Sequence, residues 1–172
     1  MSFAEAVQKG IEIVRLDRAA IREAAAEPLA FAPALLIAAL SGLAMWPFVF
    51  RFAFHGLVTG PLLGLALLFL GGLIFHFLAS LFDGHGDYVA LLRVWGLSRV
   101  LGWLWVIPFV GLVIDLWSFV VAVVVLEELY GLKRTQAVLA VALPLLALFV
   151  LTAIFLFNLV VLGGLLSLGR FS

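Results

Sequence analysis

The sequence contains no cysteine and very few charged side chains. Of its 172 residues, 12% are charged and 66% are hydrophobic, and the net charge is zero. The lack of cysteine excludes disulfides and thiolate metal sites, and the zero net charge gives no reason to expect a nucleic-acid partner. A soluble domain carries about 25% charged residues. A chain with half that share cannot cover its surface with charge in water, so the composition predicts an integral membrane protein.

Long uncharged stretches separate the few charged residues. Residues 28–168 contain ten Asp, Glu, Lys and Arg side chains, of which eight lie in the segments 83–99 and 127–134. Within a bilayer every backbone N–H and C=O must be paired inside the protein, so only helices or closed barrels cross it. Barrel strands alternate apolar and polar residues, whereas runs such as Leu62–Leu70 do not. We therefore predict an all-α membrane protein.

Five segments are long and apolar enough to be transmembrane helices, since about 20 residues cross the hydrocarbon core. They lie at about 29–50, 61–82, 88–107, 110–130 and 135–162. Pro108 separates the third from the fourth, and Pro144 predicts a kink in the fifth. Gly56, Gly60 and Gly64 are spaced by four, which predicts a close helix contact within the chain or across a dimer.

The N-terminal segment has a different pattern, typical of an amphipathic helix. Apolar residues of the segment 3–26 recur on one face, at Phe3, Val7, Ile11, Val14, Ile21 and Ala25. Asp17 is placed to cap a second, shorter helix. We therefore divide the chain into an interfacial helix over 1–28 and a five-span domain over 29–172. The interfacial helix either lies on the membrane surface or packs at the foot of the bundle. Residues 1–27 carry nine charges and no apolar stretch, which predicts no cleavable signal peptide.

The distribution of lysine and arginine predicts the orientation. With five spans, one side of the membrane receives eight of these residues and the other side receives only Arg51 and Arg170. Because cytoplasmic loops carry the excess of Lys and Arg, we expect a cytoplasmic N-terminus and a periplasmic C-terminus.

Three stretches carry a resemblance to a known family. They are LDRAAIRE at 16–23, DGHGDY at 83–88 followed by VIPFVG at 106–111, and LYGLKRTQA at 129–137. Their order and spacing resemble the Yip domain family, the Ypt/Rab-interacting membrane proteins, and in particular its short bacterial members. One departure is that the family often has Asp-Pro where this chain has Asp17-Arg18. The resemblance implies five spans, a bacterial inner-membrane location and no catalytic residues, and the Rab binding of eukaryotic members is not carried over.

Charged residues at membrane depth are the best candidates for a site. Arg93 and Glu127 lie about 24 and 27 Å from the turn between the third and fourth spans, so we expect Arg93 to pair with Glu127 or Glu128. Arg99 should point toward Asp115 or toward cytoplasmic water. These five residues form either structural ion pairs or a polar binding pocket.

The sequence gives no reason to expect catalysis, a metal or a cofactor. Asp83, His85 and Asp87 alternate in a glycine-rich loop, but their spacing fits no metal cage and a solvated turn is favoured. The chain contains neither a nucleophile elbow nor a phosphate-binding glycine loop.

Our leading hypothesis is a non-catalytic inner-membrane protein that binds membrane lipids or a protein partner, with a homo-oligomer left open. The alternative is a small permease or channel subunit that uses Arg93, Arg99, Asp115 and Glu127. A transporter often shows internal repeats, and no repeat is found, which weakens the alternative.

Overall fold

The computed structural model describes residues 1–44, 54–107 and 110–168, and within them every element of regular secondary structure is a helix. The predicted all-α fold is therefore confirmed. The elements, with η for a 3-10 helix, are α1 (Phe3–Val14), α2 (Arg18–Ala26), η1 (Pro28–Ala30), α3 (Phe31–Ala44), α5 (Gly56–Leu81), α6 (Tyr88–Ser98), η2 (Arg99–Val106), α7 (Gly111–Tyr130) and α8 (Arg134–Leu168).

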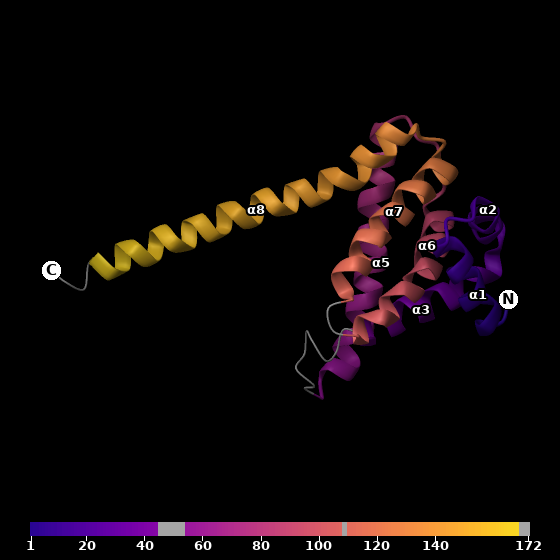
Figure 1. The fold of residues 1–172 in the computed structure, drawn as a ribbon, viewed down its shortest axis with the longest axis horizontal. Helices are drawn as coiled ribbons and strands as arrows, with labels where there is room; N and C mark the ends of the chain where they lie inside the picture. Colours follow the sequence, from indigo (N-terminus) through magenta and orange to yellow (C-terminus); the bar gives the residue numbers. More distant parts are fainter. Residues whose placement is uncertain (45–53, 108–109, 169–172) are drawn as a thin grey trace.

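The helices form a bundle with one long projection (Figure 1). Helices α5, α6 and α7 pack against one another, α3 crosses α5, α6 and η2, and α1 and α2 cover α6 and α7. Helix α8 starts against α7 and α5 and then leaves the bundle, so that the C-terminal end lies far from the other helices. Of its side chains up to Leu159, the buried ones are Ala137, Ala140 and Val141, all in its first two turns. The helix continues through Pro144 without interruption.

Three described segments are long and apolar enough to cross a membrane: Gly56–Leu81, Tyr88–Val106 and Arg134–Leu159. A fourth is obtained if α2 and the segment Pro28–Ala44 count as one span bent by 95°. Of the five predicted spans, that over 29–50 is thus described only as far as Ala44, and its remainder lies outside the described residues. Helix α7 has the length of a span but contains three acidic residues, Asp115, Glu127 and Glu128.

The N-terminal segment forms two helices, and the cap predicted at Asp17 is confirmed. The Asp17 carboxylate accepts hydrogen bonds from the backbone N–H groups of Ala19 and Ala20, at 2.8 and 3.3 Å. The buried face of α1 is Ala6, Gly10 and Ile13, which is displaced from the predicted apolar stripe, because Gly10 lets the α1 backbone approach α6. A Cβ atom at Gly10 would lie 2.5 Å from the carbonyl oxygen of Leu97.

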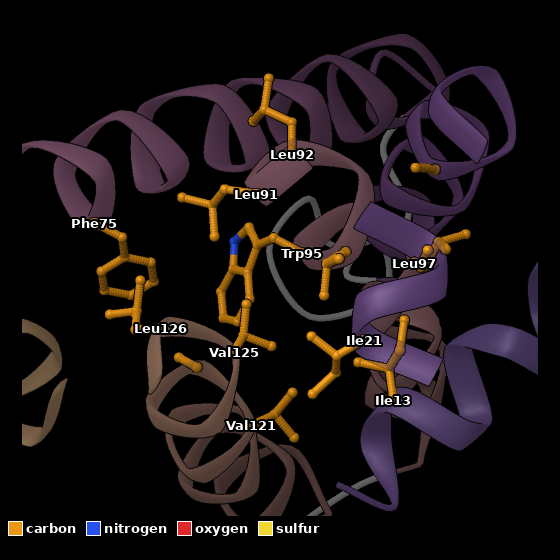
Figure 2. Packing of buried hydrophobic residues seen from close by; sticks show 14 of the residues in the cluster. Ile13, Ile21, Phe75, Leu91, Leu92, Trp95, Leu97, Val121, Val125 and Leu126 are labelled. Atoms are coloured by element: carbon orange, nitrogen blue, oxygen red, sulfur yellow. The ribbon is translucent and has the colours of Figure 1, made fainter. Parts of the chain in front are cut away.

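Trp95 of α6 lies at the centre of the core (Figure 2). The edge of its indole ring meets Phe75 of α5 at a centroid distance of 5.4 Å. Val125 and Leu126 of α7 are fully buried in the same cluster. Ile13 and Ile21 extend that cluster into α1 and α2. The two N-terminal helices therefore share one apolar core with α5, α6 and α7.

Helices α3 and α5 are held in backbone contact by glycines. A Cβ atom at Gly42 would lie 2.1 Å from the carbonyl oxygen of Gly60 and 2.6 Å from the amide nitrogen of Gly64. Lipid supplies no hydrophobic drive for helices to associate, so close van der Waals packing through small residues takes its place. The row of glycines on α5 therefore makes a close helix contact within the chain. The sequence had left open whether this contact forms within the chain or across a dimer.

This contact predicts the effect of a single methyl group. Gly42→Ala should destabilise the protein by about 1–3 kcal/mol, the usual cost of overpacking, because backbone atoms cannot move out of the way as a flexible side chain can. The control is Gly71→Ala on α5, where the nearest atom to the new Cβ is Trp95 Nε1 at 3.9 Å. Thermal unfolding in detergent micelles should show a lower midpoint for Gly42→Ala only, and equal midpoints would contradict the prediction.

Candidate functional site

Two groups of charged residues occupy the bundle, and the first joins α2 to one end of α7. Arg18 donates to Glu127 at 2.5 Å and to Glu128 at 2.9 Å, and Arg22 also binds Glu128. The two glutamate side chains are only 11% and 12% exposed, whereas those of the arginines are 48% and 61% exposed. Buried carboxylates are thus matched by arginines that reach them from the surface, which is the arrangement that makes burial of charge tolerable.

The expected pairing of Arg93 with Glu127 or Glu128 is wrong. Arg93 instead donates to the backbone carbonyl oxygen of Ala25 at 2.6 Å, at the end of α2. The expected pairing rested on depths within the hairpin of the third and fourth spans alone. It omitted α2, whose Arg18 comes 109 residues before Glu127 in the chain.

A related network joins α1 to α2. Lys9 lies 2.9 Å from a carboxylate oxygen of Glu12 on its own helix and 2.9 Å from one of Glu23 on α2. Hydrogen bonds to Glu23 and then to Glu12 raise the pKa of Lys9 above its ordinary value, because both carboxylates stabilise the ammonium. The network holds the two N-terminal helices together.

The second charged group lies in a groove between α5, α7 and α8. Its volume is about 1300 Å³, and its walls come chiefly from α5 and from the part of α8 around Pro144. Arg99, Asp115 and Ser118 are the polar side chains among the described residues that line it, together with the indoles of Trp95 and Trp105. The groove is open, because the apolar side chains on its rim, such as Phe77 and Leu148, are exposed by 61% and 64%.

Arg99 and Asp115 face the groove without forming an ion pair. The guanidinium of Arg99 lies over the ring of Trp95, with its central carbon 5.2 Å from the ring centroid, a distance at which a cation is attracted to the face of the ring. Asp115 accepts a hydrogen bond from Trp105 Nε1 at 3.3 Å. Both charged residues were candidates from the sequence, whereas neither tryptophan was. The only signal in the sequence was spacing: Trp95 precedes Arg99 by four residues, and Trp105 precedes Asp115 by ten.

The loop at 83–87 and the neighbouring aromatic side chains are structural. Asp87 caps α6 by accepting a hydrogen bond from the backbone N–H of Ala90 at 2.7 Å, and the backbone N–H of His85 donates to the carbonyl oxygen of Tyr130. His76 Nδ1 lies 2.6 Å from the hydroxyl of Tyr130. Among the residues that the structure describes, no group of three His, Asp or Glu side chains could hold a metal ion.

Comparison with known proteins identifies a family. A model of the Yip1 domain matches residues 12–157, which cover most of the chain and include both charged groups, at Arg18, Arg22, Glu127 and Glu128 and at Arg99 and Asp115. No curated protein and no solved structure matches the chain.

The cluster of α2 and α7 predicts that Arg18 stabilises the fold. Arg18→Ala should cost about 1–2 kcal/mol, because it removes two charge-assisted hydrogen bonds from buried carboxylates and is itself partly screened by solvent. The matched control is Arg15→Ala, which removes the same charge from an exposed side chain.

A double variant tests the assignment further. Glu127→Gln in the Arg18→Ala background should cost less than the same change alone, because the partner has already been removed. The measurement is unfolding in detergent of the single and double variants. Strictly additive losses would show that Arg18 and Glu127 do not stabilise each other.

Proposed function

Because the chain belongs to the Yip1 domain family and has helices apolar enough to cross a membrane, we propose that it is a non-catalytic integral membrane protein that binds a lipid in the groove between α5, α7 and α8. The observation that carries the proposal is the groove itself. It combines many apolar side chains with a few polar ones, which is the general composition of small-molecule sites. A lipid fits such a site because its acyl chain is apolar and its headgroup is polar.

The position of the groove favours lipid over a soluble ligand. Its walls belong to α5 and α8, two of the segments long and apolar enough to span a membrane. Exposed apolar side chains on such helices face hydrocarbon, so the opening between them is reached from the bilayer. A lipid can therefore enter the groove directly from the bilayer, without passing through water.

The alternative of a permease or channel subunit has less support. A path for a polar solute needs water or polar side chains along its length, whereas the walls of this groove are apolar. Of the four charged residues that the alternative invokes, Arg93 is bonded to α2 and Glu127 to Arg18. Only Arg99 and Asp115 remain for a ligand.

We further propose that the charged end of the bundle faces the cytoplasm of a bacterial cell, with α1 and α2 on the cytoplasmic side. The support is the excess of Lys and Arg on that side of a five-span topology. Arg18, Arg22 and Arg134 all gather around Glu127 and Glu128 at one end of α7.

Filling the groove should release its lipid. Gly71→Phe places a large ring on the groove wall, where there is room beside Trp95 Nε1. Native mass spectrometry after mild detergent extraction should show that this variant retains about tenfold less lipid than the unmodified protein, because the ring occupies the ligand's volume.

The matched control is Leu62→Phe on the same helix, at a side chain that is 60% exposed and does not line the groove. It adds a similar ring outside the groove and should leave the amount of retained lipid unchanged. Equal retention by both variants, or no retained lipid in the unmodified protein, would refute lipid binding in the groove.

The orientation has its own test. Single cysteines introduced at Ser2 and at Gln136 should react, in intact cells, only with thiol reagents that cross the membrane, since both positions are placed on the cytoplasmic side. The absence of native cysteine makes the labelling specific. Labelling of either site by an impermeant reagent would reverse the proposed orientation.

A further inference from the structure

Of the described side chains that line the groove, Trp95 and Arg99 each have a buried nitrogen without a hydrogen-bond partner, and Arg99 is the charged one. Its Nε is buried and has no hydrogen-bond partner. Its guanidinium lies over the ring of Trp95, with the central carbon 5.2 Å from the ring centroid. A guanidinium carries five N–H donors in a planar fork that fits the oxygens of a phosphate or carboxylate. A buried charge without hydrogen bonds is costly, so the groove holds a cation prepared to receive an anionic group.

Asp115 and Trp105 provide a site for a cationic group, opposite in charge to the site at Arg99. The hydrogen bond from Trp105 Nε1 occupies one carboxylate oxygen of Asp115 and leaves the other oxygen without a described donor. A carboxylate beside an aromatic ring is suited to an ammonium group, which is attracted both by the negative charge and by the face of the ring. Gly111 leaves room for this indole, because a Cβ atom there would lie 3.0 Å from the Trp105 ring.

The charges that line the groove favour a zwitterionic ligand over an anionic one. Of the described residues that line it, Arg99 and Asp115 are the charged ones, and the structure places no salt bridge between them. Their charges sum to zero. A ligand with one anionic and one cationic group would satisfy both residues and add no net charge to a low-dielectric site. An anionic ligand would satisfy Arg99 and leave Asp115 facing a like charge.

We propose that the groove binds a zwitterionic phospholipid, with its phosphate on Arg99, its ammonium between Asp115 and Trp105, and an acyl chain between α5 and α8. This assignment rests on the proposed lipid-binding function and names the headgroup that the site selects. The apolar walls alone would accept any acyl chain, whereas the separated charges distinguish one headgroup from another.

The test is competition between two phospholipids with identical acyl chains. One carries a phosphoethanolamine headgroup and the other a phosphoglycerol headgroup, which is anionic and lacks the ammonium. Delipidated protein in detergent micelles is offered an equimolar mixture, and native mass spectrometry counts each lipid bound. The unmodified protein should prefer phosphoethanolamine by about tenfold, the scale of one charge-assisted interaction in a partly buried site.

Four variants separate the two halves of the headgroup site. Asp115→Asn should abolish or reverse the preference, because it removes the partner of the ammonium. Arg99→Gln should reduce binding of both lipids, because both carry a phosphate. Arg99→Lys and Asp115→Glu keep the charges and should keep the preference, which guards against a general loss of folding. Arg93→Gln is the control, since Arg93 lies outside the groove and is bonded to Ala25.

The outcomes are distinct. A preference for the phosphoglycerol lipid, or a preference that survives Asp115→Asn, would overturn the headgroup assignment while leaving lipid binding intact. Displacement of the lipid by an equal concentration of soluble phosphoethanolamine would show that the headgroup alone is the ligand and would overturn the lipid as its source. Retention of lipid by Gly71→Phe would instead refute the proposed function itself.

Discussion

The cost of placing charge away from water governs the arrangement of this chain. A charged side chain at the centre of a bilayer costs about 2.5–3.5 kcal/mol on insertion scales, and most of the few charged residues are arranged to avoid that cost. Glu127 and Glu128, nearly buried at one end of α7, receive Arg18 and Arg22 from α2. The ion pairs fix α2 against α7, and the apolar face of α2 then adds Ile21 to the core around Trp95. The position of the N-terminal helices therefore follows from the need to neutralise two glutamates.

Packing among the apolar helices depends on small residues, since lipid provides no hydrophobic drive between them. Gly42, Gly60 and Gly64 bring α3 and α5 into backbone contact. At α8, Ala137 and Ala140 are fully buried at its base, whereas from Leu143 to Leu159 most side chains are large and exposed. Helix α8 leaves the bundle at this change in residue size, and Pro144 lies on the wall where the two diverge. The groove thus arises because close packing of α8 stops after two turns.

The all-helical class and the family follow from the sequence, since uncharged runs of about 20 residues have few alternatives in lipid. The cap at Asp17 was also predictable, because it depends on neighbouring residues alone. The partners of Glu127 and Glu128 were not. Depth along one hairpin can match Arg93 to Glu127, but it gives no information about a helix that folds back from more than one hundred residues away. The tryptophans beside Arg99 and Asp115 were missed because an indole in an apolar run looks like any other core residue.

The two charged groups differ in a way that separates a structural role from a binding role. At the end of α7, three arginines surround two glutamates, and each glutamate has an arginine within 2.9 Å. In the groove, no salt bridge joins Arg99 to Asp115. A buried atom without a hydrogen-bond partner occurs in both groups, at Glu127 Oε1 and at Arg99 Nε, but only Glu127 also has an arginine in a salt bridge. Because both residues line the same apolar groove without a salt bridge between them, the groove leaves space for a ligand that carries both missing charges.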